Sequence, residues 1–270
     1  MTDEVVRFVK MSGAGNDFLV LGPDAAVILE AGITSWVRRV CVRSHSVGAD
    51  GVLLVEPTDA GRVRVRFYNP DGSPAFCGNG SRCAARFAHW RGMAGRELVL
   101  ETAVGDVPAE VTGERVCLEL PPPRDAGPLA LDVSGEVLEG RRIDAGTPHF
   151  VVFVDDPSRA PLESWGPVVR HHARFAPEGV NLDLVRCEGA RVVLRTWEKG
   201  VERETLACGS GAMAAAAAAR SRGAGDRITV VPKSGIPMEV AFTDAGTVTL
   251  TGDARIVFEG RLTPDQAATE

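Results

Sequence analysis

The stretch Cys77-Gly78-Asn79-Gly80 opens a run of residues with helical character, and Cys208-Gly209-Ser210-Gly211 repeats it 131 residues later. Other landmarks keep almost the same offset and order. Gly15-Asn16 falls on Gly146-Thr147, Gly48 with Asp50 falls on Gly179 with Asn181, and residues 99–100 fall on residues 230–231. Self-similarity at a fixed offset is the signature of a repeated structural unit. We therefore predict that the chain contains two copies of one domain.

The hydrophobic pattern predicts a mixed α/β (α+β) fold in both copies. In the first copy we expect strands at 5–9, 18–21, 52–56, 62–68, 97–101 and 116–120, helices at 35–44 and 79–91, and a turn at 69–72. In the second copy we expect strands at 150–154, 182–185 and 192–197, and a helix at 209–220. This last helix is rich in alanine and small on all sides, which favours a position inside a wrapped sheet.

Composition and charge exclude several classes of protein. The 270 residues are 44% hydrophobic and 24% charged, with a net charge of −6, which is typical of a globular protein. Acidic and basic residues are interspersed, so no basic stripe is present to bind nucleic acid. No apolar run reaches the ~18 residues that cross a membrane, and residues 1–10 carry charges in place of an apolar signal core. We therefore expect a cytoplasmic protein that binds neither nucleic acid nor membrane.

Cysteine and lysine usage argues against cofactors. Six cysteines in a chain of this length, without a leader, are expected to be thiols. No CxxC or HExxH motif is present, so we predict no metal. The three lysines (Lys10, Lys199 and Lys233) are not accompanied by a phosphate-binding loop, so we expect no pyridoxal cofactor.

The repeated motif has a chemical meaning of its own. A cysteine just before a helix lies beside unpaired backbone N–H groups and a positive dipole, so we expect the pKa of its thiol to fall below ~8.5. The neighbouring glycines let a substrate carboxylate approach the same amides. Two thiols on opposite faces of one carbon are what a two-base racemase needs. One takes the α-proton as thiolate, and the other delivers a proton to the opposite face.

Further motifs resemble the diaminopimelate epimerase family. They are Lys10-Met11-Ser12-Gly13-Ala14-Gly15-Asn16-Asp17-Phe18, Phe67-Tyr68-Asn69-Pro70-Asp71-Gly72-Ser73, Gly146-Thr147-Pro148-His149, Val180-Asn181, Glu198-Lys199-Gly200, and the two cysteine motifs. The resemblance implies a metal- and pyridoxal-independent homodimer that interconverts LL- and meso-2,6-diaminopimelate in lysine and peptidoglycan synthesis. It implies two pseudo-symmetric domains, each a sheet around a central helix, with the active site in the cleft between them. We expect one domain at 1–122 with 256–270, and the other at 123–255 after the linker 121–123.

The resemblance also implies roles for individual residues. Cys77 and Cys208 correspond to the acid/base cysteines, and His149 and Glu198 correspond to residues that tune these thiols. The remaining positions bind the amino-acid substrate. Gly78, Asn79, Gly209 and Ser210 hold its reacting end, Asn16, Asn69, Asn181 and Glu198 line the rest, and Thr147 and Lys199 read its far end. At these last two positions the family usually has Asn and Arg, and many members have Gln where Gly51 stands.

Two other functions remain open from the sequence. One is a cofactor-independent racemase of another amino acid on the same fold, for which Thr147 and Lys199 would be the signature. The other is a thiol redox protein in which Cys77 and Cys208 form a disulfide. Single residues also have structural interpretations. Asparagines often occur in turns, His149 is also explained as a buried imidazole, and the other cysteines are explained as buried inert thiols. Surface positions explain His171, His172, Glu202 and Glu204. Arg203 is a candidate to replace the guanidinium that is missing at position 199.

Overall fold

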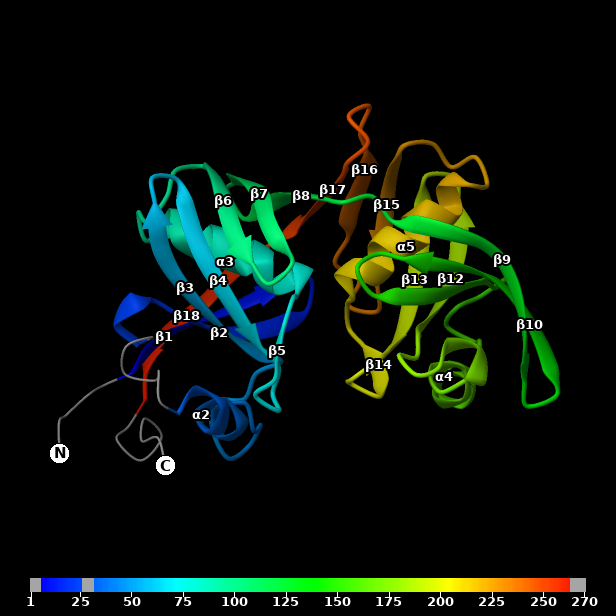
Figure 1. Cartoon of the computed structure of the whole chain (residues 1–270), viewed down its shortest axis with the longest axis horizontal. Helices are drawn as coiled ribbons and strands as arrows, with labels where there is room; N and C mark the ends of the chain where they lie inside the picture. Colours follow the sequence, from blue (N-terminus) through cyan, green and yellow to red (C-terminus); the bar gives the residue numbers. More distant parts are fainter. Residues whose placement is uncertain (1–5, 26–31, 263–270) are drawn as a thin grey trace. The chain divides into compact units, whose positions relative to one another are not determined.

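The structure, a computed structural model, describes residues 6–25 and 32–262 and divides into two compact units (Figure 1). Residues up to Leu118 form the first unit together with residues from Gly252 onward. Glu119–Thr251 form the second unit. The C-terminal stretch of the chain therefore returns to the unit in which the chain began.

The first unit is a single curved sheet whose described elements include the helices α2 and α3. Its strands hydrogen-bond in the order β18, β1, β2, β3, β4, β6, β7, β8, and β5 pairs with β4. The pairs β2–β3 and β4–β6 are parallel, and the others are antiparallel. The elements are β1 (Arg7–Gly13), β2 (Asn16–Leu21), α2 (Ile33–Val40), β3 (Gly51–Asp59), β4 (Arg62–Tyr68), β5 (Pro74–Ala75), α3 (Gly78–Trp90), β6 (Glu97–Thr102), β7 (Gly105–Thr112), β8 (Arg115–Leu120) and β18 (Arg255–Arg261).

The second unit repeats this topology strand for strand. Its order is β9, β10, β11, β12, β13, β15, β16, β17, with β14 on β13, and the parallel pairs are β11–β12 and β13–β15. The internal duplication predicted from the sequence is confirmed. The elements are β9 (Arg124–Val133), β10 (Glu136–Asp144), β11 (Pro148–Phe153), α4 (Leu162–Arg170), η1 (Ala173–Phe175), β12 (Asn181–Glu188), β13 (Arg191–Glu198), β14 (Arg203–Thr205), α5 (Gly209–Arg220), β15 (Arg227–Val231), β16 (Met238–Phe242) and β17 (Val248–Asp253).

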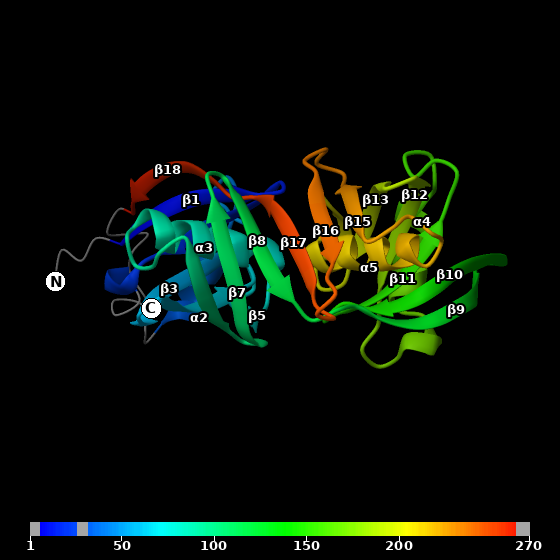
Figure 2. The same ribbon diagram turned by 90° about the horizontal axis from the view of Figure 1, so that it is seen from above.

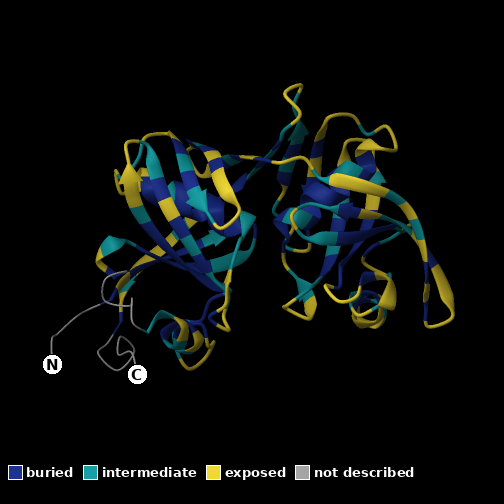
Figure 3. Ribbon diagram, in the orientation of Figure 1, coloured by how far each residue is buried: buried dark blue, intermediate teal, exposed yellow. Residues whose placement is uncertain are grey.

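Each unit wraps its sheet around one central helix. Helix α3 contacts β1, β2, β3, β4, β6 and β7, and α5 contacts β10, β11, β12, β13, β15 and β16 (Figures 1 and 2). Both helices are buried along most of their length (Figure 3). In α5 most of the alanines are buried, because side chains this small let strands approach from several directions. The wrapped helix expected from the alanine run is confirmed.

Helices α2 and α4 cover the outside of the sheets. Parallel strands need a crossover connection. Helix α2 connects β2 to β3, and α4 connects β11 to β12. Trp36, Val37 and Val40 of α2 pack in one hydrophobic cluster with β2 and β3, and α4 packs on β12 and β13. No helix in the described ranges is long and apolar enough to span a membrane.

Several element boundaries differ from the prediction. The helix expected at 35–44 is Ile33–Val40, because the Cys41 N–H closes the last turn on the Val37 carbonyl and Ser44 takes a positive φ of 71°. The strand expected at 5–9 runs from Arg7 to Gly13, and Val5 lies outside the described residues. Strand β9 was missed because its first seven residues are all exposed or half-buried, and buried residues alternate with exposed ones only from Leu131 onward.

Helix α4 touches β13 at a position that only glycine fits. A Cβ atom built on Gly166 would lie 2.3 Å from Cδ2 of Trp197, which precedes Glu198. We expect Gly166→Ala to lower the free energy of unfolding by about 1–3 kcal/mol, because the added methyl forces helix and indole apart. Denaturant unfolding measures this. Gly95→Ala is the control, since the nearest atom to its added Cβ lies 3.8 Å away. Equal midpoints for both variants would contradict the packing described.

Candidate active site

The two cysteines of the repeated motif have the same local geometry. Cys77 is the residue before α3, and its Sγ accepts a hydrogen bond from the Gly80 N–H at 3.4 Å. Cys208 is the residue before α5, and its Sγ accepts from the Gly211 N–H at 3.4 Å. Both have extended backbones. Each sulfur therefore caps the first turn of the central helix of its unit, among amides that have no partner within the helix.

A chain of polar side chains leads from Cys208 into the second unit. Cys208 Sγ lies 3.3 Å from Ser210 Oγ, and Ser210 Oγ lies 3.0 Å from His149 Nε2. His149 Nδ1 in turn lies 2.7 Å from Asp183 Oδ2. The side chains of His149 and Asp183 are both fully buried. A thiol, a hydroxyl, an imidazole and a carboxylate are thus connected in series beneath the start of α5.

Asn181 fixes the other side of this chain. Its Nδ2 lies 3.4 Å from His149 Nε2, and its Oδ1 accepts a hydrogen bond from the Lys199 backbone N–H at 2.7 Å. The side chain of neighbouring Glu198 accepts from the Thr205 hydroxyl at 2.8 Å. Residues that are far apart in the sequence therefore meet because β11 is paired with β12, and β12 with β13.

The first unit has a different network at its helix start. Asn79 Nδ2 donates to Asn16 Oδ1 at 2.5 Å, and Asn16 Nδ2 donates to Asp50 Oδ2 at 3.2 Å. The fully buried guanidinium of Arg82 donates to Asn79 Oδ1 at 2.9 Å. Because the Arg82 cation can only donate, it fixes which amide atoms of Asn79 and Asn16 donate and which accept.

Arg82 is held in place by the C-terminal part of the unit. Its Nε donates to the Asp253 carbonyl at 3.3 Å. The Asp253 carboxylate accepts from the Ala14 N–H at 2.7 Å and so fixes the turn that presents Asn16. A Cβ on Gly252 would lie 2.9 Å from the Arg82 guanidinium carbon, so glycine at this position leaves room for the buried cation.

Of the remaining predicted residues, Lys199 joins these hydrogen-bond chains only through its backbone, and the others lie outside them. Gly209 is the first residue of α5, as predicted, and Gly78 is the first residue of α3, one residue before the predicted start of that helix. Asn69 occupies the predicted turn and donates from Nδ2 to the Ser73 hydroxyl at 3.1 Å. Thr147 lies in the turn between β10 and β11, where its carbonyl accepts from the Ala145 N–H at 3.1 Å. Lys199 contributes its backbone amide to the Asn181 contact.

The expectation that the helix start lowers both thiol pKa values is wrong for Cys208. Burial raises the pKa of the Cys208 thiol well above its usual range, and the negative charges of Glu198 and Asp183 raise it further. The hydrogen bond between Cys208 and Ser210 and the one from the Gly211 N–H act in the opposite direction but do not outweigh burial. The dipole argument failed because it ignored desolvation, which favours the neutral thiol.

The charge beside Cys77 has the opposite sign. Burial lowers the pKa of Arg82, while the negative charges of Cys83, Cys77 and Asp253 oppose that change. The positive charge of Arg82 therefore acts on Cys77, whereas the charges that act on Cys208 are negative. The two thiols thus share a backbone geometry and differ in the charges that surround them.

The properties of the other four cysteines are those of structural residues. None of the six, all of which lie in the described residues, forms a disulfide. Burial raises the pKa of Cys41 to about 12, and it also raises the pKa of Cys83 and of Cys187. Cys41 and Cys83 are buried, as predicted, whereas Cys117 and Cys187 are only half-buried.

One of the four predicted surface groups proved to be largely buried. Glu204 pairs with Arg195 through two contacts of 2.6 and 3.0 Å, and both side chains are only 14% and 13% exposed. His171 is exposed, and His172 caps the short helix η1 through a hydrogen bond from the Arg174 N–H. Arg203, the suggested substitute cation, is exposed.

Sequence reasoning missed Asp183, Thr196 and Arg82. Thr196 donates to the second oxygen of Asp183 at 2.7 Å. The signal for Asp183 was present, because it is the one charged residue of the apolar run Leu182-Asp183-Leu184-Val185. Arg82 gave no such signal, since a helix of surface character would also carry an arginine there.

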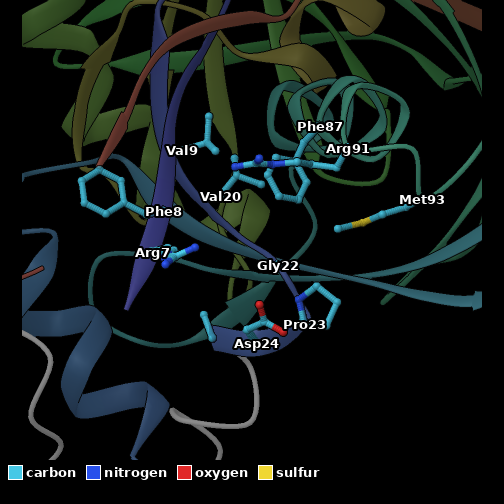
Figure 4. Close-up of a pocket in the computed structure, with 11 residues that line it drawn as sticks. Arg7, Phe8, Val9, Val20, Gly22, Pro23, Asp24, Phe87, Arg91 and Met93 are labelled. Carbon is cyan, nitrogen blue, oxygen red and sulfur yellow. The ribbon is translucent and has the colours of Figure 1, made fainter. Parts of the chain in front are cut away.

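Neither a metal site nor the pocket in Figure 4 involves these residues. Within the part of the chain that the structure describes, no group of three or more His, Cys, Asp or Glu side chains is placed to hold a metal ion. The pocket has a volume of about 670 Å³ and is lined by Arg7, Phe8, Phe87, Arg91 and Met93 among others (Figure 4). Its lining includes none of the predicted site residues.

Comparison with known proteins agrees with the motifs. The sequence model described as diaminopimelate epimerase matches residues 8–119 and 142–257. The chain is 38% identical to a diaminopimelate epimerase from Aquifex aeolicus over 275 residues, which cover 96% of this chain and 99% of that protein. It is 39% identical to a diaminopimelate epimerase from Archaeoglobus fulgidus over 275 residues, or 95% and 96% of the two chains.

Solved structures share the fold at much lower identity. A hydroxyproline epimerase from Agrobacterium vitis with bound trans-4-hydroxy-L-proline has a TM-score of 0.73 at 19% identity, covering 98% of this chain and 94% of that chain. A probable proline racemase from Agrobacterium radiobacter has a TM-score of 0.72 at 18% identity, covering 97% and 96%. At this identity the similarity shows the fold alone.

The raised pKa of Cys208 has a consequence for stability. Above the usual thiol pKa of ~8.5 the unfolded chain loses this proton and the folded chain keeps it, so stability falls as pH rises. We expect Cys208→Ala to make the fall in unfolding free energy shallower by up to about 1.4 kcal/mol per pH unit. Denaturant unfolding at pH 8.5 to 10.5 measures this. The buried-residue control Val230→Ala lowers stability without changing the slope, and an unchanged slope in Cys208→Ala would refute the assignment.

Proposed function

The chain belongs to the diaminopimelate epimerase family, and we propose that it interconverts LL- and meso-2,6-diaminopimelate without a cofactor, using Cys77 and Cys208 as its two proton-transfer groups. The observation that carries the proposal is the matched geometry of the two cysteines. Each sulfur caps a buried helix beside backbone N–H groups. A cysteine sulfur at such a position lies next to amides that can bind a carboxylate, so it can exchange a proton with a substrate held there.

The proposed reaction is a proton exchange at the α-carbon. One cysteine, as thiolate, takes the α-proton and becomes a thiol. The other cysteine, as thiol, delivers its proton to the opposite face of the same carbon and becomes a thiolate. The negative charge that develops on the substrate carboxylate in between is stabilised by the N–H groups at the helix starts. The reverse reaction exchanges the two roles, so each cysteine serves as acid in one direction and as base in the other.

The charges that surround the two cysteines differ. The positive charge of Arg82 acts on Cys77, whereas burial and the carboxylates of Glu198 and Asp183 raise the pKa of Cys208. The two cysteines therefore exchange protons with the substrate in different electrostatic surroundings. One thiolate and one thiol are what the first proton transfer requires.

The choice of diaminopimelate over other amino acids rests on the relatives. Relatives from Aquifex aeolicus and Archaeoglobus fulgidus that match almost the whole chain are diaminopimelate epimerases. Asn16, Asn69 and Asn181 would supply hydrogen bonds to parts of the substrate away from the reacting carbon. Thr147 and Lys199 replace an amide and a planar guanidinium by a hydroxyl and a point charge, so the second carboxylate loses bidentate contacts. The homodimer and the independence from metal and pyridoxal stay predictions.

Removal of either cysteine tests the two-base chemistry. We expect Cys77→Ala and Cys208→Ala each to lower epimerisation by at least about 10²-fold, because every turnover needs both groups. Circular dichroism or coupled assay of LL-diaminopimelate, with deuterium uptake at the α-carbon from D₂O, measures the rate. Cys187→Ala removes a thiol that lies at neither helix start and is expected to keep the wild-type rate.

The result also separates the proposal from the redox alternative. Near-normal turnover in either helix-start variant would rule out two-base chemistry. A wild-type protein that takes up no α-deuterium, yet cycles between a dithiol and a Cys77–Cys208 disulfide with a turnover of its own, would favour the thiol redox protein.

Substrate preference tests the far-end assignment. We expect kcat/KM for LL-diaminopimelate to exceed that for histidine, proline, lysine and glutamate, because only diaminopimelate has a second amino-acid centre for the amide groups to bind. Steady-state kinetics on the five compounds measures this. A mono-amino acid that is preferred by more than about tenfold, or ~1.4 kcal/mol of transition-state binding, would show that Thr147 and Lys199 mark a different racemase.

A further inference from the structure

The polar chain below Cys208 has an apolar counterpart below Cys77. In the second unit, Asp183 of β12 pairs in register with Thr196 of β13. In the first unit, the corresponding strands pair Leu53 with Phe67. The helix starts confirm the correspondence. A Cβ on Gly211 would meet Asp183 and Thr196, and a Cβ on Gly80, the equivalent glycine, would meet Leu53.

His149 continues this correspondence on the next strand. His149 of β11 pairs with Asn181, two residues before Asp183, and Phe18 of β2 pairs with Gly51, two residues before Leu53. The trio His149, Asp183 and Thr196 thus occupies the positions held by Phe18, Leu53 and Phe67 in the first unit.

This substitution of polar for apolar residues is not required by the fold. The first unit builds the same sheet and the same buried helix on apolar side chains, two of which, Phe18 and Phe67, form an edge-to-face pair at 6.0 Å. Burying a carboxylate and an imidazole costs free energy that their mutual contact only partly returns. The trio therefore points to a chemical role at the start of α5.

The hydrogen bonds determine which nitrogen of His149 carries its proton. The Lys199 N–H donates to Asn181 Oδ1, so the amide nitrogen of Asn181 is the atom that faces His149 Nε2. An amide NH₂ group only donates, so Nε2 is an acceptor. The proton is then on Nδ1, where it is donated to Asp183 Oδ2 at 2.7 Å. Ser210, 3.0 Å from Nε2, donates its hydroxyl proton to the same nitrogen.

We propose that Asp183 is a positioning residue which holds His149 in this tautomer, so that His149 accepts, through Ser210, the proton of Cys208 when Cys208 has to act as the base. The proposal rests on the proposed function, in which the reverse reaction uses Cys208 as thiolate. The proton passes from Cys208 Sγ to Ser210 Oγ while the Ser210 hydroxyl proton passes to His149 Nε2. A thiolate and an imidazolium result, with no change in net charge, and the same path returns the proton.

The transfer answers a difficulty created by burial. The groups that face Cys208 are Glu198 of β13, Asp183 of β12, His149 of β11, and Ser210 with the Gly211 N–H of α5. Two of these are carboxylates, which oppose a thiolate. Protonated His149, paired with Asp183, would place a cation next to the thiolate, as Arg82 does for Cys77. The two cysteines are thus assisted as bases in different ways. Cys77 has the fixed cation Arg82, and Cys208 has the proton acceptor His149.

Asp183→Asn tests the proposal. Asp183 accepts from Thr196 through Oδ1 and from His149 through Oδ2. Asparagine has one oxygen for these two donors, so with Thr196 satisfied its NH₂ group faces Nδ1 and forces the wrong tautomer. The measurement is the rate at which iodoacetamide alkylates each cysteine of the substrate-free protein between pH 6 and 10, resolved by peptide mass spectrometry. Cys77 in the same sample is the internal reference.

We expect Asp183→Asn to slow alkylation of Cys208 by about tenfold or more near pH 7.5 and to leave Cys77 within about twofold, with kcat/KM reduced by about 10²–10⁴. Thr196→Ser is the matched control, because it perturbs the same buried site and keeps the hydroxyl that donates to Asp183. We expect it to leave Cys208 alkylation within about twofold. An unchanged Cys208 rate in Asp183→Asn, or a parallel loss at both cysteines, would overturn the proposal.

A second measurement needs no variant at Asp183. Nitrogen-15 NMR of the wild-type protein is expected to show His149 as the Nδ1–H tautomer, with the resonance identified by its loss in His149→Phe. The Nε2–H tautomer would overturn the proposal even if Asp183→Asn does not fold. The two proposals fail separately. A protein that does not epimerise diaminopimelate but shows the selective Cys208 effect refutes the proposed function alone, and an active epimerase without that effect refutes only the role of Asp183.

Discussion

Both units depend on one interaction, the hydrogen bond from a helix-start amide to a cysteine sulfur. The first N–H groups of a buried helix have no partner within the helix and cannot reach bulk water. In α3 and α5 a thiol meets one of them, and glycines on either side keep the approach open. The amides that require a cap are also groups able to hold a carboxylate. The structural cap and the proposed binding site therefore lie at one place in each unit.

Duplication produced two helix starts with the same geometry, and the buried charges make them different. Arg82 lies behind the first, whereas Asp183 and Glu198 lie near the second. In the proposed two-base reaction, this difference means that the two thiols exchange protons in different electrostatic surroundings. The difference also lowers the free energy of unfolding, since a buried cation and a buried carboxylate must both be desolvated when the chain folds. Each is surrounded by hydrogen-bonding partners that offset this cost in part.

The fold itself is shared with proteins of low sequence identity. Structures with TM-scores above 0.7 and identities below 20% include a hydroxyproline epimerase and a probable proline racemase. At such identities the fold does not determine the function, which has to be argued from the residues of the site. In this chain Thr147 lies in a turn at the end of a strand and Lys199 just past the end of another, where a substitution changes the surface offered to a ligand without disturbing the core.

The sequence by itself determined the duplication, the central helices and the two cysteines that precede them. These features are local, because a glycine-rich helix start and an alanine-rich helix are specified by neighbouring residues. Only the tertiary structure decided that His149, Asp183 and Ser210 form one chain and that Arg82 lies behind Asn79. Those contacts depend on strand register and on which face of a helix is covered. The direction in which the pKa of Cys208 shifts was also decided by the tertiary structure. The helix dipole that lowers this pKa is local, whereas the burial and the carboxylates that raise it come from strands assembled around the helix.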